Sequence, residues 1–206
     1  MGLHFSLEEF KNRKDKVIKL LNEEKLDAIL MFRQESMYWL TGYDTFGYVF
    51  FQTLVLDQKG NIVLLTRAPD LRQAQNTSNI NDVRIWVDRN GSDPTEDLKI
   101  ILDELNLKGK KIGVEYEAYG LTGRSALRLN KSLENYCSIE DASELVTKLR
   151  VIKSNEEINY VKKAANLADL ALNEVWKHAK AGVSESKILA EMNKVIFCLL
   201  YTSDAA

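Results

Sequence analysis

The sequence predicts an α/β fold in which a mixed sheet of about six strands carries helices on both faces. From Phe5 to about Glu140, helix-like patterns alternate with short strand-like patterns, an order typical of layered α/β domains. The uninterrupted apolar run from Ala28 to Phe32 indicates a strand that is covered on both faces. The turn-rich segment 57–61 separates two strand-like runs, which predicts an antiparallel hairpin in the same sheet.

The first helix is predicted to run from Leu7 to about Glu24. Ser6 and Glu9 have the spacing of a capping box, and Phe5 and Phe10 have that of a hydrophobic staple. These two signals fix the start of the helix. Its expected core face comprises Phe10, Val17, Leu20 and Leu21.

The following elements are predicted from apolar runs and turn signals. Strands are expected at Ala28–Phe32, Val49–Leu56, Ile62–Leu65, Val83–Val87, Lys111–Glu115 and Tyr136–Ile139. Helices are expected at Arg67–Asn76, Pro94–Leu105, from Thr122 to Lys131, and after Asp141, with Glu144 at the third helical position. The helix at Pro94 has the strongest local signal. Asp93 is an N-cap acceptor, Pro94 occupies the first helical position, and Glu96 occupies the third.

A long helix is predicted from about Asn155 to Ala179, and a second helix is predicted from Ser184 to Phe197. Ser154 and Glu157 form a capping box at the start, and Gly182 separates the two helices. The long helix carries an apolar stripe that needs burial. Its members are Ile158, Val161, Ala165, Ala168, Leu172, Val175 and Ala179. Two amphipathic helices cannot enclose a core, so they are expected to begin a second domain that the remaining sequence is too short to finish.

Composition and charge exclude several classes of function. The chain has 206 residues, of which 45% are hydrophobic, as in globular proteins. Lys and Arg total 28 against 30 Asp and Glu, without a basic run, so no nucleic-acid or membrane partner is expected. Apolar runs fall far short of the ~20 residues that span a bilayer. Because the start Met1–Phe5 has no signal-like core, a cytoplasmic location is expected, where Cys137 and Cys198 are two free thiols.

Candidate catalytic groups are few. The two histidines are His4, in the terminal segment, and His178, near the end of the long helix, where a structural role is favoured over metal binding. The glycines form no phosphate loop, and no nucleophile motif occurs. We therefore expect no catalytic residue and no metal site in this chain.

The unusual stretch is Ser36–Tyr48, a predicted loop that packs five aromatic residues around two glycines. Such a loop either covers the edge of the sheet or meets a ligand or partner, and both interpretations remain open. Arg67 and Arg72 are expected to be solvated.

Two segments, Met37–Tyr43 and Leu149–Ala165, resemble motifs of the creatinase, prolidase and aminopeptidase P (Xaa-Pro peptidase) family. Met37-Tyr38-Trp39-Leu40-Thr41-Gly42-Tyr43 resembles the (Asn/Ser)-x-x-Tyr-Leu-(Thr/Ser)-Gly-(Tyr/Phe) segment of the amino-terminal domain. The segment from Leu149-Arg150 through Lys153-Ser154, Glu157-Ile158 and Ala164-Ala165 resembles the family's junction with the catalytic domain. The resemblance covers the chain to about Phe197.

The resemblance implies a creatinase/prolidase-type amino-terminal domain at 1–148 and the first helices of a truncated "pita-bread" metallopeptidase domain at 149–197. Residues 198–206 depart from the family and are expected to be a non-native tail. In the family, two divalent metal ions (Mn, Co or Zn) are held by two Asp, a His and two Glu beyond the matched segment. No position here inherits a metal-ligand or catalytic role, so the chain alone should be inactive.

The resemblance also implies a homodimer formed through the amino-terminal domain. A loop near Tyr43–Tyr48 would then approach the partner's active site and help to form the substrate cleft. Asp44, Phe46 and Tyr48 are the substrate-side candidates.

The family includes enzymes for dipeptides ending in proline, longer peptides, creatine and ectoine, and the sequence does not choose among these substrates. A stand-alone α/β module that binds or dimerises, without catalysis, is the competing interpretation. A longer reading frame with metal-ligand motifs would favour the enzyme, and a native stop near Ala206 would favour the module.

Overall fold

The computed structural model describes residues 2–201, with the side chains of residues 2–199. The chain forms two compact units, Met1–Ile152 and Lys153–Ala206. Residues 202–206, which end the predicted 198–206 tail, lie outside the described part of the chain.

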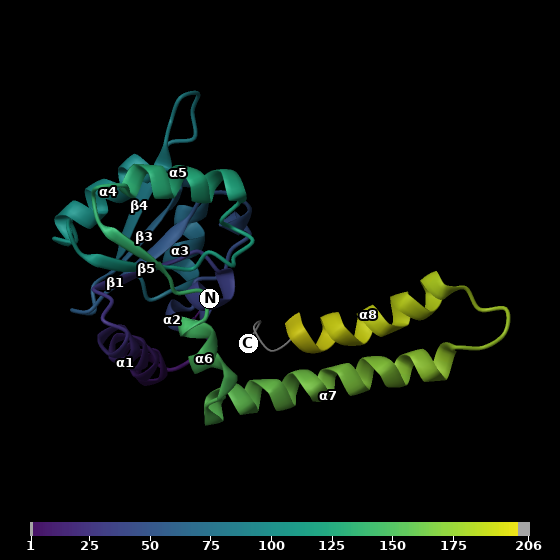
Figure 1. Ribbon diagram of the computed structural model, residues 1–206. Coiled ribbons are helices and arrows are strands. Elements are labelled where there is room, and N and C mark those ends of the chain that lie inside the picture. Colours follow the sequence, from purple (N-terminus) through teal and green to yellow (C-terminus); the bar gives the residue numbers. More distant parts are fainter. Residues whose placement is uncertain (1, 202–206) are drawn as a thin grey trace. The chain divides into compact units, whose positions relative to one another are not determined.

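The first unit is built on one mixed sheet. Its strands are β1 (Ala28–Met31), β2 (Thr53–Asp57), β3 (Ile62–Arg67), β4 (Asp82–Trp86), β5 (Lys111–Val114) and β6 (Ser138–Asp141). The six strands lie in the order β4-β3-β2-β1-β5-β6. Figure 1 labels β1, β3, β4 and β5 of this sheet. β2 is antiparallel to both β1 and β3, whereas the β3/β4, β1/β5 and β5/β6 pairs are parallel. The predicted fold class and hairpin are confirmed.

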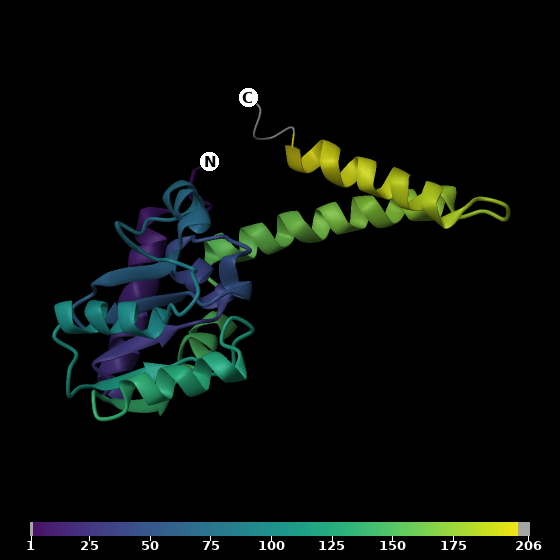
Figure 2. The same cartoon turned by 90° about the horizontal axis from the view of Figure 1, so that it is seen from above.

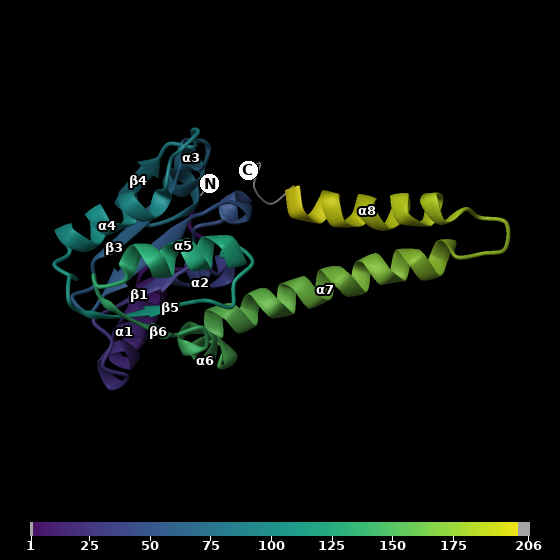
Figure 3. The same cartoon turned by 45° about the horizontal axis from the view of Figure 1, so that its top comes forward.

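Helices cover both faces of this sheet, as predicted. One face carries α1 (Leu7–Glu23), α2 (Gln34–Thr41), α3 (Leu71–Thr77) and α6 (Leu145–Val151). The opposite face carries α4 (Pro94–Glu104) and α5 (Gly123–Leu133). Figure 1 shows α4 and α5 above the strands and α1 and α6 below them, and two further views are given in Figure 2 and Figure 3. Alternate residues of β1 enter the two cores, as expected for a strand covered on both faces.

Helix α1 begins as its sequence predicts. Ser6 Oγ accepts a hydrogen bond from the Glu9 amide at 3.1 Å, and the rings of Phe5 and Phe10 meet edge to face. Phe10, Val17 and Leu21 are buried and Leu20 is partly buried. The pattern did not predict Arg13, which is 1% exposed and lies 4.1 Å from the Phe5 ring centroid. Its guanidinium donates to the Trp39 carbonyl at 2.8 Å and to Glu9, which holds α1 to α2.

The predicted loop Ser36–Tyr48 is wrong in its first half, because residues 34–41 form α2. No side chain at the Arg33 N-cap closes this helix, so the sequence carries no local start signal. A distant residue binds the segment just before the helix. Glu115 accepts from the amides of Phe32 and Arg33, at 3.1 and 3.0 Å. Gly42 ends the helix in the left-handed conformation, with φ of 82°.

Two further boundaries differ from the prediction. The strand expected from Val49 starts at Thr53, because residues 47–49 form the 3₁₀ turn η1 (Gly47–Val49) and the side chain of Val49 is 61% exposed. Asp141 ends β6 and does not cap a helix at its first turn. Its carboxylate instead accepts from the Ser143 amide, and α6 begins at Leu145. The helix expected at Arg67–Asn76 divides into η2 (Ala68–Asp70) and α3.

The second unit contains two helices, α7 (Asn155–His178) and α8 (Glu185–Tyr201), as predicted. Ser154 and Glu157 form a complete capping box, and Gly182 has φ of 85° in the connection. Among residues 153–199, Ala171 alone is buried. Several stripe members stay exposed: Ile158 by 40%, Val161 by 55% and Leu172 by 52%. No helix within residues 2–201 is long and apolar enough to cross a membrane.

Candidate contact surface

The aromatic loop, residues 43–50, connects α2 to the start of β2 and turns its rings in different directions. Tyr43 is fully buried, and its hydroxyl donates to Gln52 at 3.2 Å. Phe46 is 86% exposed, and its ring is inclined at 30° to that of Tyr48, with 6.4 Å between the centroids. The loop therefore does both things that its sequence allows, since Tyr43 covers the sheet and Phe46 faces outward.

The three substrate-side candidates lie within this loop. Asp44 is exposed, and its amide donates to the Thr77 hydroxyl at 3.2 Å. Phe46 and Tyr48 follow on the outer side, with Tyr48 partly buried. Val49 and Phe50, the next two residues, are 61% and 43% exposed. Adjacent exposed aromatic side chains of this kind are typical of contact surfaces.

The side chain of Asp70 contacts those of Thr45 and Arg67 at the aromatic loop. Thr45 Oγ1 donates to Asp70 Oδ1 at 3.1 Å and accepts from the Gly47 amide at 2.8 Å. Arg67 lies 3.7 Å from the Asp70 carboxylate, and its guanidinium carbon is 3.2 Å from the Phe50 ring centroid. The prediction that Arg67 is solvated is wrong, because its side chain is 17% exposed. Arg72 is exposed, as predicted.

Glu115 is a buried carboxylate that the sequence did not single out. It follows β5, where Ser36 donates to Oε1 at 2.6 Å, while the amides of Phe32 and Arg33 donate to Oε2. Burial raises the pKa of the Glu115 carboxyl to about 7, and the hydrogen bond from Ser36 opposes that rise. Glu115 therefore joins the end of β5 to the start of α2.

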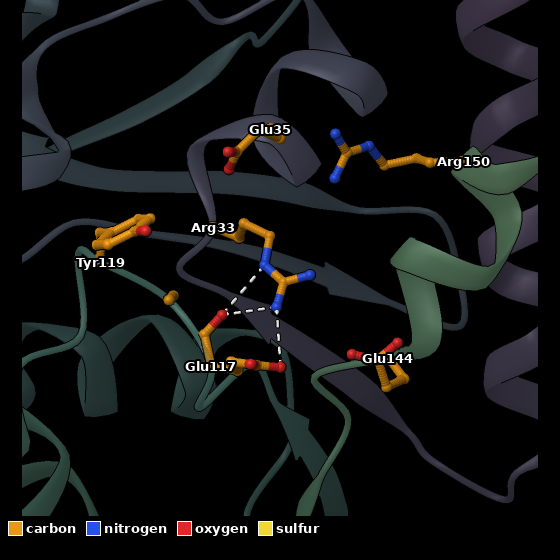
Figure 4. A pocket seen from close by; sticks show the side chains of 7 residues that line it. Arg33, Glu35, Glu117, Tyr119, Glu144 and Arg150 are labelled. Carbon is orange, nitrogen blue, oxygen red and sulfur yellow. Dashed lines mark hydrogen bonds and ion pairs between the residues drawn. The ribbon is translucent and has the colours of Figure 1, made fainter.

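An open cavity of about 620 Å³ lies where the parallel strands β1, β5 and β6 end (Figure 4). Arg33 comes from the β1–α2 junction, and its guanidinium donates twice to the Glu117 carbonyl, at 2.6 and 3.1 Å. The other lining residues are Glu35, Ala118, Tyr119, Glu144 and Arg150. Ligands of α/β proteins commonly bind at such strand ends. Sequence reasoning missed this cavity because its residues meet only through strand pairing.

Among the side chains of residues 2–199, no group of three or more His, Cys, Asp or Glu residues could hold a metal ion. His178, the last residue of α7, has its Nδ1 3.0 Å from the Glu174 carbonyl, consistent with the structural role expected for it.

The chain matches the family model of the creatinase/prolidase N-terminal domain over residues 13–152. An uncharacterised hydrolase/peptidase of Sinorhizobium fredii is 28% identical over 195 residues. The ectoine hydrolase of Halomonas elongata is 25% identical over 202 residues. These alignments cover 91% and 95% of this chain but 50% of each relative. The chain therefore spans about half the length of the curated relatives that it matches.

Solved structures show the same fold. The prolidase of Thermococcus sibiricus superposes with a TM-score of 0.75 at 20% identity, over 95% of this chain and 51% of that one. The Xaa-Pro dipeptidase of Bacillus anthracis superposes with a TM-score of 0.72 at 19% identity, over 92% of this chain and 49% of that one. At these identities the likeness establishes the fold alone.

Proposed function

This chain belongs to the creatinase/prolidase family, and we propose that it is the amino-terminal part of an Xaa-Pro peptidase-like hydrolase. The parent protein would hydrolyse Xaa-Pro peptide bonds or related amide or amidine bonds. One observation carries the proposal. The family domain fills residues 13–152 of a chain that spans half the length of relatives named as hydrolases and peptidases.

The second unit supports this proposal through its exposed apolar side chains. Besides the stripe on α7, Trp176 is 73% exposed and Leu189 on α8 is 51% exposed. Large exposed apolar side chains on a helix pair are typical of a surface that further structure covers. In a parent twice as long as this chain, the additional polypeptide would supply that cover.

The parent is proposed to use two divalent metal ions, of the Mn, Co or Zn type. Hydrolytic metal ions lower the pKa of a bound water and polarise a carbonyl. The described residues of this chain do not fit such a centre, because no suitable ligand group exists among them. No catalytic step is therefore assigned to residues of this chain.

The role of the chain in the parent is proposed to be dimerisation and formation of the substrate cleft. Asp44, Phe46 and Tyr48 would lie on the substrate side, in a homodimer that pairs through the amino-terminal unit. The exposure of Phe46 supports this role, because burying an aromatic ring at an interface is favourable, while leaving it in water brings no stability to the fold.

A cytoplasmic location is part of the same proposal. Cys137 is a half-buried thiol, and burial raises its pKa to about 11, which keeps it protonated and unreactive. A thiol of this kind is compatible with a reducing compartment.

The proposal is tested by recovering the native coding frame downstream of Phe197 and expressing the product. We expect metal-dependent cleavage of an Xaa-Pro dipeptide by the extended protein, and no cleavage of the matched Xaa-Ala dipeptide. The 206-residue chain, assayed in parallel, should cleave neither. A native stop codon at the end of this sequence would contradict the proposal and favour a non-catalytic binding module.

A further inference from the structure

We propose that Asp70 is a positioning residue, which holds the aromatic loop in the conformation that presents Phe46 and Tyr48 outward. The inference rests on the proposed function of that loop as a contact surface. Asp70 lies in η2, at the end of the sheet hairpin, and its side chain is 13% exposed. It would therefore act through the loop and would not itself touch a substrate or partner.

The carboxylate of Asp70 is directed to the loop and not to its own helix. Asp70 occupies the N-cap position of α3, yet its side chain makes no capping hydrogen bond there. It accepts instead from Thr45 Oγ1, and Thr45 in turn accepts from the Gly47 amide. Because the two hydrogen bonds meet at one hydroxyl, they fix the turn on both sides of Phe46.

A close backbone approach adds a second constraint. A Cβ at Gly47 would lie 2.6 Å from both Cγ and Oδ1 of Asp70, which is closer than real Cβ contacts allow. A side chain at residue 47 would force the Asp70 carboxylate to shift, so glycine allows the loop to lie against it. The hydrogen bonds and this contact place Asp70 directly beneath η1.

The same carboxylate orients the end of the loop. Arg67 pairs with Asp70 at 3.7 Å and lies over the Phe50 ring, in a cation–π contact. Asp70 Oδ2 and Arg67 Nε are buried without a hydrogen-bond partner among the described residues. The hold of Asp70 on the loop therefore depends on the hydrogen bond from Thr45 and on the ion pair with Arg67.

A pair of substitutions at Thr45 tests the proposal without removing Asp70. Thr45→Val keeps the size of the side chain and removes the hydroxyl, whereas Thr45→Ser keeps the hydroxyl. Amide hydrogen exchange of the full chain should show Gly47 exchanging at least about tenfold faster in Thr45→Val, with β2 amides unchanged. Thr45→Ser should behave like the wild type. Asp70→Ala should match Thr45→Val, and Arg72→Ala, an exposed substitution on α3, is the surface control.

Sedimentation equilibrium measures dimerisation of the chain. It distinguishes a failure of this proposal from a failure of the proposed function. Thr45→Val should raise the dissociation constant of the dimer by about tenfold, and Thr45→Ser should not. Wild-type exchange at Gly47 in Thr45→Val, or equal association of the two variants, would overturn the positioning role. A chain that stays monomeric would contradict the proposed pairing, while the exchange of the Gly47 amide in Asp70→Ala would still decide whether Asp70 holds the loop.

Discussion

Glu115 contacts the start of α2 although it lies far from this helix in the sequence. Its carboxylate receives two backbone amides and the Ser36 hydroxyl at the start of α2, more than 75 residues earlier in the chain. The arrangement suits either protonation state, because the Ser36 hydroxyl can donate to a carboxylate or accept from a carboxylic acid. The burial of this group makes stability depend on pH.

The first prediction concerns that dependence. The folded pKa of Glu115 is about 7, above the ordinary 4.5, so its burial becomes costly as pH rises from 4.5 to 7. Glu115→Gln should therefore gain stability relative to the wild type over this range, by an amount on the order of 3 kcal/mol. Urea unfolding at pH 5 and pH 8 measures it. A difference between the two proteins that does not change with pH would show that Glu115 is ionised throughout.

The second prediction concerns Phe46, with Phe32 as a matched control. Phe46 is 86% exposed and Phe32 is fully buried against Phe51. Phe32→Ala should cost about 3–5 kcal/mol of unfolding free energy, whereas Phe46→Ala should cost less than about 0.5 kcal/mol. Thermal unfolding of the two variants provides the comparison. Strong destabilisation by Phe46→Ala would show that this ring is part of the core, and it would contradict the proposed contact role of the loop.

At the scale of elements, local signals predicted helix starts well and loop structure poorly. Asp93 and Thr122 cap α4 and α5 through the hydrogen bonds that their sequences imply. The segments at α2 and η1 are contacted instead by Glu115 and Asp70, which lie outside the sequence windows of these two elements. Tertiary contacts override weak local propensity at such places.

The third prediction uses two glycines in different surroundings. Gly47→Ala would place a Cβ against Asp70 and should destabilise the chain by about 1–3 kcal/mol. Gly123→Ala, at the first turn of α5, meets no atom within 4 Å and should be neutral or stabilising by up to about 1 kcal/mol. Equal unfolding free energies for the two variants would exclude the close approach of the loop to Asp70.

The fourth prediction concerns α7 and α8. Helices gain most of their stability from packing, and among residues 153–199 only Ala171 is buried. Limited proteolysis should therefore cut first between Val151 and Gly182. Hydrogen exchange should show faster exchange in α7 than in β1. Equal protection of α7 and β1 would mean that the exposed stripe is covered in this chain.

For the whole molecule, the sequence predicted the architecture and the family but only part of the site. The mixed sheet, its hairpin and both terminal helices follow from apolar periodicity and turn residues, which are local properties. The exposed loop was also visible, as a cluster of aromatic residues. The burial of Arg13 and the contacts of Arg67 and Asp70 beneath the loop could not be predicted from the sequence. Whether a charged side chain is buried depends on partners that other elements supply.

The kinetics of the extended protein test the central claim most directly. The measurement compares kcat/KM for an Xaa-Pro dipeptide between the wild type, Phe46→Ala and the surface control Leu127→Ala, which alters a side chain 74% exposed on α5. We predict that Phe46→Ala lowers kcat/KM by at least about tenfold, with its melting temperature unchanged, and that Leu127→Ala has no effect. Equal kcat/KM values for all three proteins would contradict the claim that the aromatic loop forms part of a substrate cleft.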